Sequence, residues 1–223
     1  MDGEPVVLDP IDVDLDRETV ASQPPFSTWF ATRSGAETKA SVSRLIEPVC
    51  SAVEPRGIFQ IVPIEETPIE AYDPPPELVA GSHLVVGVIA LAAESPSTAA
   101  FESKIDALVW DALENATLQL AREQILTAIR NETEALDFNT TRVYAPGSGS
   151  CEWPIENRRF VFEHLPTERI GARLGNGQAT EPSKTLAFAM GTGPDIEQAD
   201  LLLSCADCDI IERCVYAGAK TTP

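Results

Sequence analysis

The sequence lacks long apolar runs and a basic leader at its start. No apolar run approaches the roughly 20 residues that a membrane-spanning helix requires. The longest run, Leu84–Ala93, has the length of a buried strand. The first residues, Met1–Pro5, lack the basic region of a secretory signal peptide. We therefore expect a cytoplasmic protein without a membrane segment.

Basic residues are also scarce. The chain has 16 lysines and arginines against 35 aspartates and glutamates, which gives a net charge of −19. A field of this sign repels phosphate backbones and anionic lipid, so we expect neither nucleic acid nor a membrane surface as a partner. An acidic surface fits solubility, basic protein partners and cationic ligands equally well.

The common catalytic motifs are absent, and the chain has only 2 histidines. No P-loop, HExxH or GxSxG pattern occurs. Gly191-Thr-Gly193 is a fragment of a dinucleotide motif, but the proline that follows has no N–H to offer a phosphate. His83 and His164 are more simply structural or solvated residues. The residues therefore indicate no nucleophilic or acid–base site.

Hydrophobic periodicity predicts helices and strands in the first two thirds of the chain. A helical stripe that ends before Pro55 is formed by Val42, Leu45, Ile46, Val49, Cys50 and Val53, with Cys50 as a small core residue. Residues 57–62 and the apolar run from Leu84 are predicted to be strands. A long helix is expected from about residue 98 to 136, with inward positions Phe101, Ile105, Leu108, Val109, Ala112, Ala116 and Leu120.

The last third alternates irregularly between short elements. A strand is expected at 140–144, a turn at 146–149 and a short helix at 155–165. Strands at 170–174 and 185–191 are expected to pair around the Gly-Asn-Gly turn at 175–177. The fold class is therefore α+β. We divide the chain into an acidic N-terminal arm (1–28), a main domain (29–200) and a cysteine-rich tail (201–223).

One segment has the composition of a ligand-binding loop. Arg142-Val-Tyr-Ala-Pro-Gly-Ser148 joins a strand to a Pro-Gly turn, which lets the backbone approach a ligand and leaves amides free to donate. An arginine beside such a turn can grip a carboxylate with two hydrogen bonds. The alternative is an ordinary turn beside a surface arginine.

This segment and those that follow it resemble the activation domain of cobalamin-dependent methionine synthase, and more closely its free-standing relatives in corrinoid methyltransferase systems. The match is clear over residues 142–193 and looser over most of the chain beyond residue 30. The matching residues are Tyr144, Ala145, Pro146, Gly147, Trp153, Pro154, Ile155, Ile170, Gly171, Leu174, Pro182, Lys184 and Thr185. Three positions depart from the family pattern. Ser148 replaces a tyrosine, and Arg142 lies one position further from Pro146 than the family's arginine. Thr185 replaces the serine that follows the family's lysine, which is a mild change.

The resemblance implies a single C-shaped domain with a mainly antiparallel sheet flanked by helices. Such a domain binds S-adenosylmethionine (AdoMet) and presents its methyl group to cobalamin on a partner, so that oxidised cobalamin is reduced and remethylated. The implied partners are a corrinoid protein or methyltransferase, with a reductase as a further candidate. The AdoMet-binding residues carried over, in a groove between 142–149 and 182–185, are Arg142, Tyr144, Ala145, Pro146, Gly147, Ser148 and Lys184.

The tail carries a cysteine cluster, Cys205, Cys208 and Cys214. Thiolates at this spacing can bind zinc or an iron–sulfur cluster or do redox work, and an odd count of 5 cysteines fits a reducing compartment better than a disulfide framework. Three ligands are one short of a closed site, so Cys151, Asp207, Asp209 or a partner group would complete it. Three reduced thiols at the end of a helix are the equally open alternative.

The sequence is also compatible with two other functions. One is a non-catalytic partner of a corrinoid protein that carries a cysteine-ligated metal or redox site and binds no AdoMet. The other is a scaffold without a ligand. The residues do not decide whether the protein is itself an enzyme.

Overall fold

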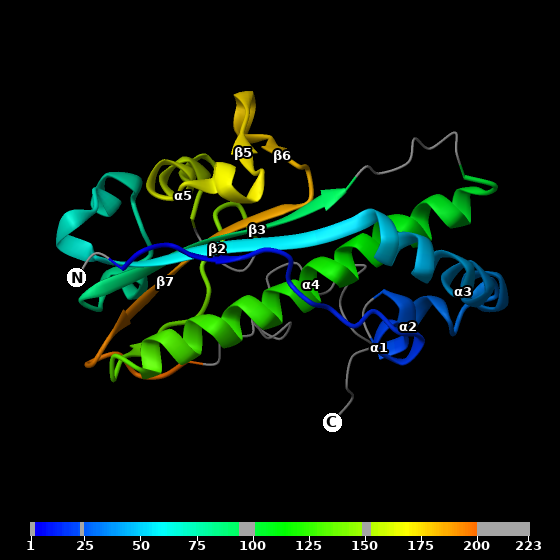
Figure 1. Ribbon diagram of the computed structural model, residues 1–223, viewed down its shortest axis with the longest axis horizontal. Coiled ribbons are helices and arrows are strands. Elements are labelled where there is room, and N and C mark those ends of the chain that lie inside the picture. The colour runs from blue at the N-terminus through cyan, green and yellow to red at the C-terminus, as the bar shows by residue number, and fades with distance from the viewer. Residues whose placement is uncertain (1–2, 23–24, 94–100, 149–152, 200–223) are drawn as a thin grey trace.

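The computed structural model describes residues 3–22, 25–93, 101–148 and 153–199, and its centre is a five-stranded sheet (Figure 1). Neighbouring strands are antiparallel throughout, in the order β1-β2-β3-β7-β4. The strands are β1 (Val6–Leu8), β2 (Val53–Pro63), β3 (His83–Ala93), β4 (Asn139–Thr140) and β7 (Thr185–Gly193). Strands β5 (Arg173–Leu174) and β6 (Thr180–Glu181) form a separate pair.

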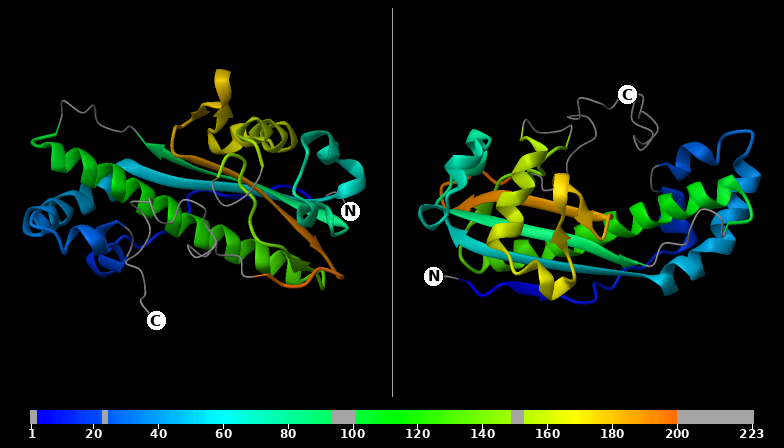
Figure 2. Two further views of the ribbon diagram at one scale, coloured as in Figure 1. Left: turned by 180° about the vertical axis from the view of Figure 1, so that it is seen from behind. Right: turned by 90° about the horizontal axis from the view of Figure 1, so that it is seen from above.

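Helices cover both faces of the sheet (Figures 1 and 2). The long helix α4 runs along one face, and α5 lies on the other with the short helical turns. The α-helices are α1 (Arg17–Ser22), α2 (Phe26–Trp29), α3 (Gly35–Ala52), α4 (Lys104–Glu134) and α5 (Arg158–His164). The 3-10 helices are Ile64–Glu66, Ile69–Tyr72, Pro76–Val79, Ile155–Asn157, Thr167–Ile170 and Asn176–Gln178. None of the helices in the described ranges is both long and apolar enough to cross a membrane.

Three groups of buried side chains hold these layers together. One lies between the sheet and α5, and a second lies between the sheet and α4. A third joins α3 and the N-terminal segment to the first half of α4. The apolar run of β3 contributes to all three because this central strand is buried on both faces.

The main helices and strands lie close to where periodicity predicts them. The strand from Leu84, the helix at 155–165 and the stripe from Val42 to Val53 match β3, α5 with its preceding turn, and α3. The first 28 residues contain β1, α1 and part of α2, and their side chains enter the core at Ile11, Leu15, Val20 and Phe26.

Three expectations about packing are wrong. Cys50 is exposed and lines a surface cavity with Leu15 and Thr117, whereas its neighbour Val49 enters the core. Leu108 is 60% exposed, since the inward face of α4 passes through its neighbours Val109 and Trp110 instead. Strand β7 pairs with β3, and the Gly-Asn-Gly turn joins the small pair β5–β6.

Candidate functional site

The segment around Tyr144 extends the edge of the sheet beside β7. Tyr144 exchanges two backbone hydrogen bonds with Ala189, each of 2.9 Å. Side chains alternate across an extended segment, so Val143 and Ala145 enter the core beneath α4, and Tyr144 enters the core beneath α5. Arg142 therefore lies on the same face of the sheet as Tyr144.

Arg142 and Tyr144 are stacked. The guanidinium carbon of Arg142 lies 4.9 Å from the centre of the Tyr144 ring, which is the geometry of a cation–π contact. Tyr144 is only 2% exposed, and this burial raises the pKa of its phenol above the ordinary value of 10.0. At neutral pH the ring therefore stays uncharged, and the guanidinium is the positive group of the pair.

A loop between β2 and β3 forms the opposite wall. Asp73, Glu77 and the three prolines between them line a cavity of about 400 Å³ together with Arg142 and Tyr144. The residue pattern predicts only a connection here, not part of a site. The signal available in the sequence is the run of three prolines, which fixes the backbone between two carboxylates.

The Trp-Pro pair at 153–154 helps to hold this loop in position. Trp153 is 1% exposed, and its Nε1 donates to the carbonyl oxygen of Tyr72 at 3.1 Å. The side-chain amide of Asn157 donates to the same oxygen at 2.7 Å. The backbone immediately before Asp73 is therefore fixed to the segment that follows the Pro-Gly turn.

The amides of the Pro-Gly turn are hydrogen-bonded within the chain, contrary to the expectation of free amides. The amide of Gly147 donates to the carbonyl oxygen of Trp153 at 2.7 Å, and that of Ser148 donates to Ala145 at 3.0 Å. Pro146 is buried, and none of residues 146–148 lines the cavity. The turn shapes the site instead of offering its amides to a ligand.

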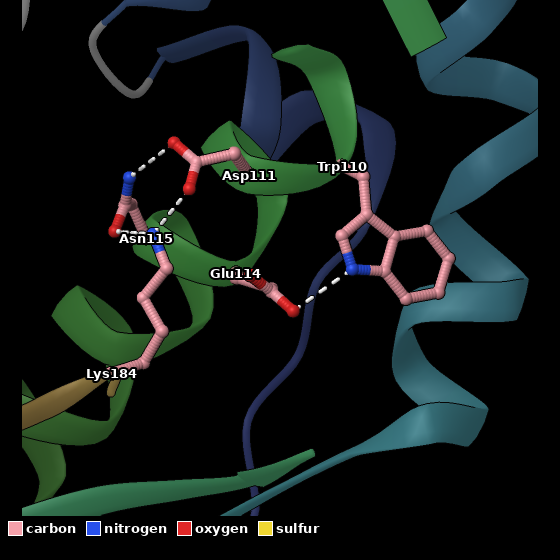
Figure 3. A network of polar contacts seen from close by, with 5 residues as sticks. All are labelled: Trp110, Asp111, Glu114, Asn115 and Lys184. Carbon is pink, nitrogen blue, oxygen red and sulfur yellow. Dashed lines mark hydrogen bonds and ion pairs between the residues drawn. The ribbon is translucent and has the colours of Figure 1, made fainter. Parts of the chain in front are cut away.

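Lys184 lies away from Arg142. Tyr144 pairs with Ala189, which lies five residues from Lys184, and five residues of extended chain correspond to about 17 Å. The ammonium of Lys184 bonds to Asp111 at 2.6 Å and to Asn115 at 2.8 Å on α4 (Figure 3). It therefore lies on the α4 face of the sheet, whereas Arg142 and Tyr144 face α5. The structure joins Arg142 and Tyr144 in one cavity and does not bring Lys184 to them.

The predicted metal ligands Cys205, Cys208 and Cys214 lie outside the described residues, as does Cys151. Within the described ranges, no group of three histidine, cysteine or acidic side chains is arranged to hold a metal ion.

The cavity combines one cation, two carboxylates and an aromatic ring. A guanidinium is suited to a ligand carboxylate, and Asp73 and Glu77 are suited to positive groups of the same ligand. The volume falls within the range of small-molecule sites. No histidine or cysteine is among the described residues that line it. The arrangement fits recognition of a small molecule that carries both charges.

Comparisons with known proteins identify the fold. No protein-family model and no curated protein matches the chain. Among solved structures, the MetH reactivation domain bound to AdoHcy matches with a TM-score of 0.56 and 14% sequence identity. The match covers 87% of this chain and 80% of that one. The predicted α+β fold, a mainly antiparallel sheet flanked by helices, is therefore confirmed as the fold of that domain.

Proposed function

We propose that this protein binds AdoMet in the cavity lined by Arg142, Tyr144 and residues 73–77, and that it supports the reductive remethylation of a corrinoid methyltransferase. Two observations support the proposal. The fold is that of a domain solved with AdoHcy, the demethylated form of AdoMet. The cavity is lined by a guanidinium and two carboxylates.

The residues present fit the charges of AdoMet. Its amino-acid end carries a carboxylate and an ammonium, and its sulfonium is a second positive centre. In this proposal Arg142 binds the carboxylate of AdoMet, and Asp73 and Glu77 bind its positive centres. The stacked ring of Tyr144 holds the guanidinium in place, which reduces the side-chain entropy that binding would otherwise cost.

Few catalytic groups are needed for this function. AdoMet supplies an already activated methyl group, and the reduced corrinoid of the partner is a strong nucleophile. The work of this chain is to bind and orient the donor and to dock on the partner. The described residues that line the cavity offer charges but no nucleophile. Such a cavity is consistent with a protein that binds the methyl donor while the corrinoid acts as the nucleophile.

The single observation that carries the proposal is the Arg142–Tyr144 stack inside the cavity, and calorimetric titration with AdoMet tests it. We expect saturable binding by the unmodified protein. Arg142→Glu should weaken binding by about 10- to 100-fold, because a charge-assisted hydrogen bond to the carboxylate is replaced by repulsion. Arg159→Glu is the matched control, since Arg159 is 64% exposed and forms a surface ion pair with Glu163.

Two results would contradict the proposal. One is the absence of AdoMet binding at millimolar concentration, which would favour a corrinoid partner that binds no AdoMet. The other is an equal loss of affinity in Arg142→Glu and Arg159→Glu, which would show a general charge effect instead of a site. AdoHcy gives a further comparison, because it lacks the sulfonium charge. If Asp73 and Glu77 interact with that charge, AdoMet should bind several-fold more tightly than AdoHcy.

A further inference from the structure

A second cavity lies on the other face of the sheet, where α4 ends. It has a volume of about 320 Å³ and lies between the start of the chain, strands β2 and β3, and the last turn of α4. Its position on the α4 face separates it from the Arg142–Tyr144 cavity, which faces α5. The proposed AdoMet function makes no use of it.

Aromatic and aliphatic side chains form most of its wall. Phe59 is fully buried at its floor, and the rings of His83 and Phe138 lie 5.0 Å apart at an angle of 42°. Leu136 lines the cavity while remaining 40% exposed. Tilted rings at this separation present both a face and an edge to a third ring. The interior is therefore suited to a flat apolar group.

His83 adds one polar group to this wall without adding charge. Its Nδ1 lies 2.8 Å from the hydroxyl oxygen of Ser82, and no described residue is hydrogen-bonded to its Nε2. Burial lowers the pKa of His83 below the ordinary 6.5, so the imidazole is neutral at pH 7. A neutral ring of this kind packs against an aromatic ligand without repelling a cation.

The rim of the cavity is acidic. Glu4 and Glu132 both line it and are both exposed. The last turn of the 31-residue helix α4 contains no basic residue, so no side chain of that turn offsets the negative end of the helix dipole. An apolar, aromatic interior below a negative rim is complementary to a ring that carries an ammonium group. The volume is at the lower end of the range for small-molecule sites.

We propose that this cavity is a second ligand site, for a small aromatic amine whose ring lies against Phe138, His83 and Leu136 and whose ammonium faces Glu4 and Glu132. The proposal does not depend on AdoMet binding, and each can fail without the other.

Backbone amide NMR titration of the full chain with tryptamine tests the site, with indole-3-propionate as the probe of opposite charge. We expect tryptamine to shift the amides of Phe59, His83 and Leu136 in a saturable way, with a Kd of about 1 mM for a ligand of this size. The carboxylate probe should bind about three- to tenfold more weakly, since exposed carboxylates discriminate modestly. Saturating AdoMet should leave both titrations unchanged.

Two variants locate the site. Ala135→Trp places a large ring into the cavity from an exposed position and should abolish the tryptamine shifts, whereas Thr127→Trp, two turns earlier on α4, should not. Glu132→Gln should weaken tryptamine binding about two- to threefold while Glu123→Gln leaves it unchanged. If Ala135→Trp does not fold, the Glu132 and Glu123 pair decides the question. Absence of saturable shifts, equal affinity for the two probes, or equal effects of Glu132→Gln and Glu123→Gln would overturn the proposal.

Discussion

Three charged side chains show how neighbours decide what a residue does. Arg142 lies in the cavity opposite Asp73 and Glu77. Lys184 is held by Asp111 and Asn115 on α4 and joins the start of β7 to that helix (Figure 3). Asp106 is buried at the start of the same helix, where it pairs with Arg44 at 2.5 Å. Of the three, only Arg142 lines the proposed AdoMet site.

Lys184→Met should therefore affect stability and not AdoMet binding. The lysine is 22% exposed, and its loss leaves Asp111 without the ion pair, so we expect a decrease of about 1 kcal/mol in the free energy of unfolding. AdoMet affinity should change less than about twofold, within the scatter expected for remote sites. Urea unfolding and calorimetry measure the two effects. A large loss of affinity with unchanged stability would place Lys184 at the ligand after all.

Asp106 should make stability depend on acid pH. Hydrogen bonding from Ser41, with the nearby Ser103 and Arg44, lowers the pKa of Asp106 below its ordinary 3.8. The folded state therefore favours the ionised carboxylate, and this stabilisation is present above pH 3.8 and is lost as pH falls through the folded-state pKa. Asp106→Asn should cost about 1–3 kcal/mol at pH 7 and progressively less below about pH 4.

Urea unfolding at neutral and acid pH checks this dependence, with Asp137→Asn as the control at an exposed position. If Asp106→Asn were equally destabilising at pH 7 and at about pH 3, the carboxylate charge would not be the source of the stabilisation.

The cysteine spacing in the tail predicts a bound metal that the described residues do not test. We propose that Cys205, Cys208 and Cys214 act as one unit. Anaerobically prepared protein should then contain about one equivalent of zinc, or iron with acid-labile sulfide. Cys205→Ser combined with Cys208→Ser should remove it. Cys50→Ser is the control, because Cys50 is exposed on α3 and is not one of these three cysteines. If anaerobically prepared protein contained no metal, the three cysteines would be thiols without a shared function.

At the scale of elements, the Pro-Gly turn joins two parts of the candidate site. Gly147 has a φ of +80°, which glycine adopts without strain, and a Cβ there would lie 2.8 Å from the Cβ of Ile155. The turn thereby brings Trp153 to the carbonyl of Tyr72, just before Asp73. The geometry of the acidic wall depends on this close approach.

Gly147→Ala should therefore both destabilise the protein and weaken AdoMet binding. We expect a loss of about 2–4 kcal/mol, since the substitution combines an unfavourable φ with a steric clash. Gly177→Ala separates the two causes, because Gly177 has a φ of +70° and a Cβ added there would meet no atom within 4 Å. That control should cost about 1–2 kcal/mol and leave AdoMet affinity unchanged. Equal costs in unfolding experiments would mean that contact with Ile155 is unimportant.

At the scale of the whole molecule, the sequence predicts elements better than their partners. Apolar periodicity locates α3, α4 and β3 because each buries a regular stripe or run. It does not show that β7 pairs with β3 across about a hundred residues, because pairing depends on contacts distant in sequence. The same limit applies to the site. Arg142 and Tyr144 are recognisable from their motif, whereas Asp73 and Glu77 join them through contacts distant in sequence, among them the hydrogen bonds at Tyr72.

The acidic surface should control how the whole molecule meets a basic partner. Beyond the cavity wall, the β2–β3 connection carries exposed Glu65, Glu66 and Glu70, and no lysine or arginine occurs between residues 64 and 82. This charge lies on the segment that also supplies Asp73 and Glu77. A corrinoid partner with a basic surface would therefore be attracted towards the proposed AdoMet site.

Anaerobic pull-downs at two salt concentrations test this attraction, with the recovered corrinoid measured by its absorbance. Raising the salt from about 0.1 M to about 1 M shortens the screening length from about 10 Å to about 3 Å, so recovery should fall. Replacing Glu65, Glu66 and Glu70 together by glutamine should lower recovery at low salt and reduce its salt dependence. The same replacement of Glu123, Glu132 and Glu134 on α4 removes equal charge from another surface and should have little effect. If the two triple variants behaved alike, only the net charge of −19 would matter. If the unmodified protein recovered no corrinoid at low salt, the proposed role as an accessory to a corrinoid methyltransferase would lose its support.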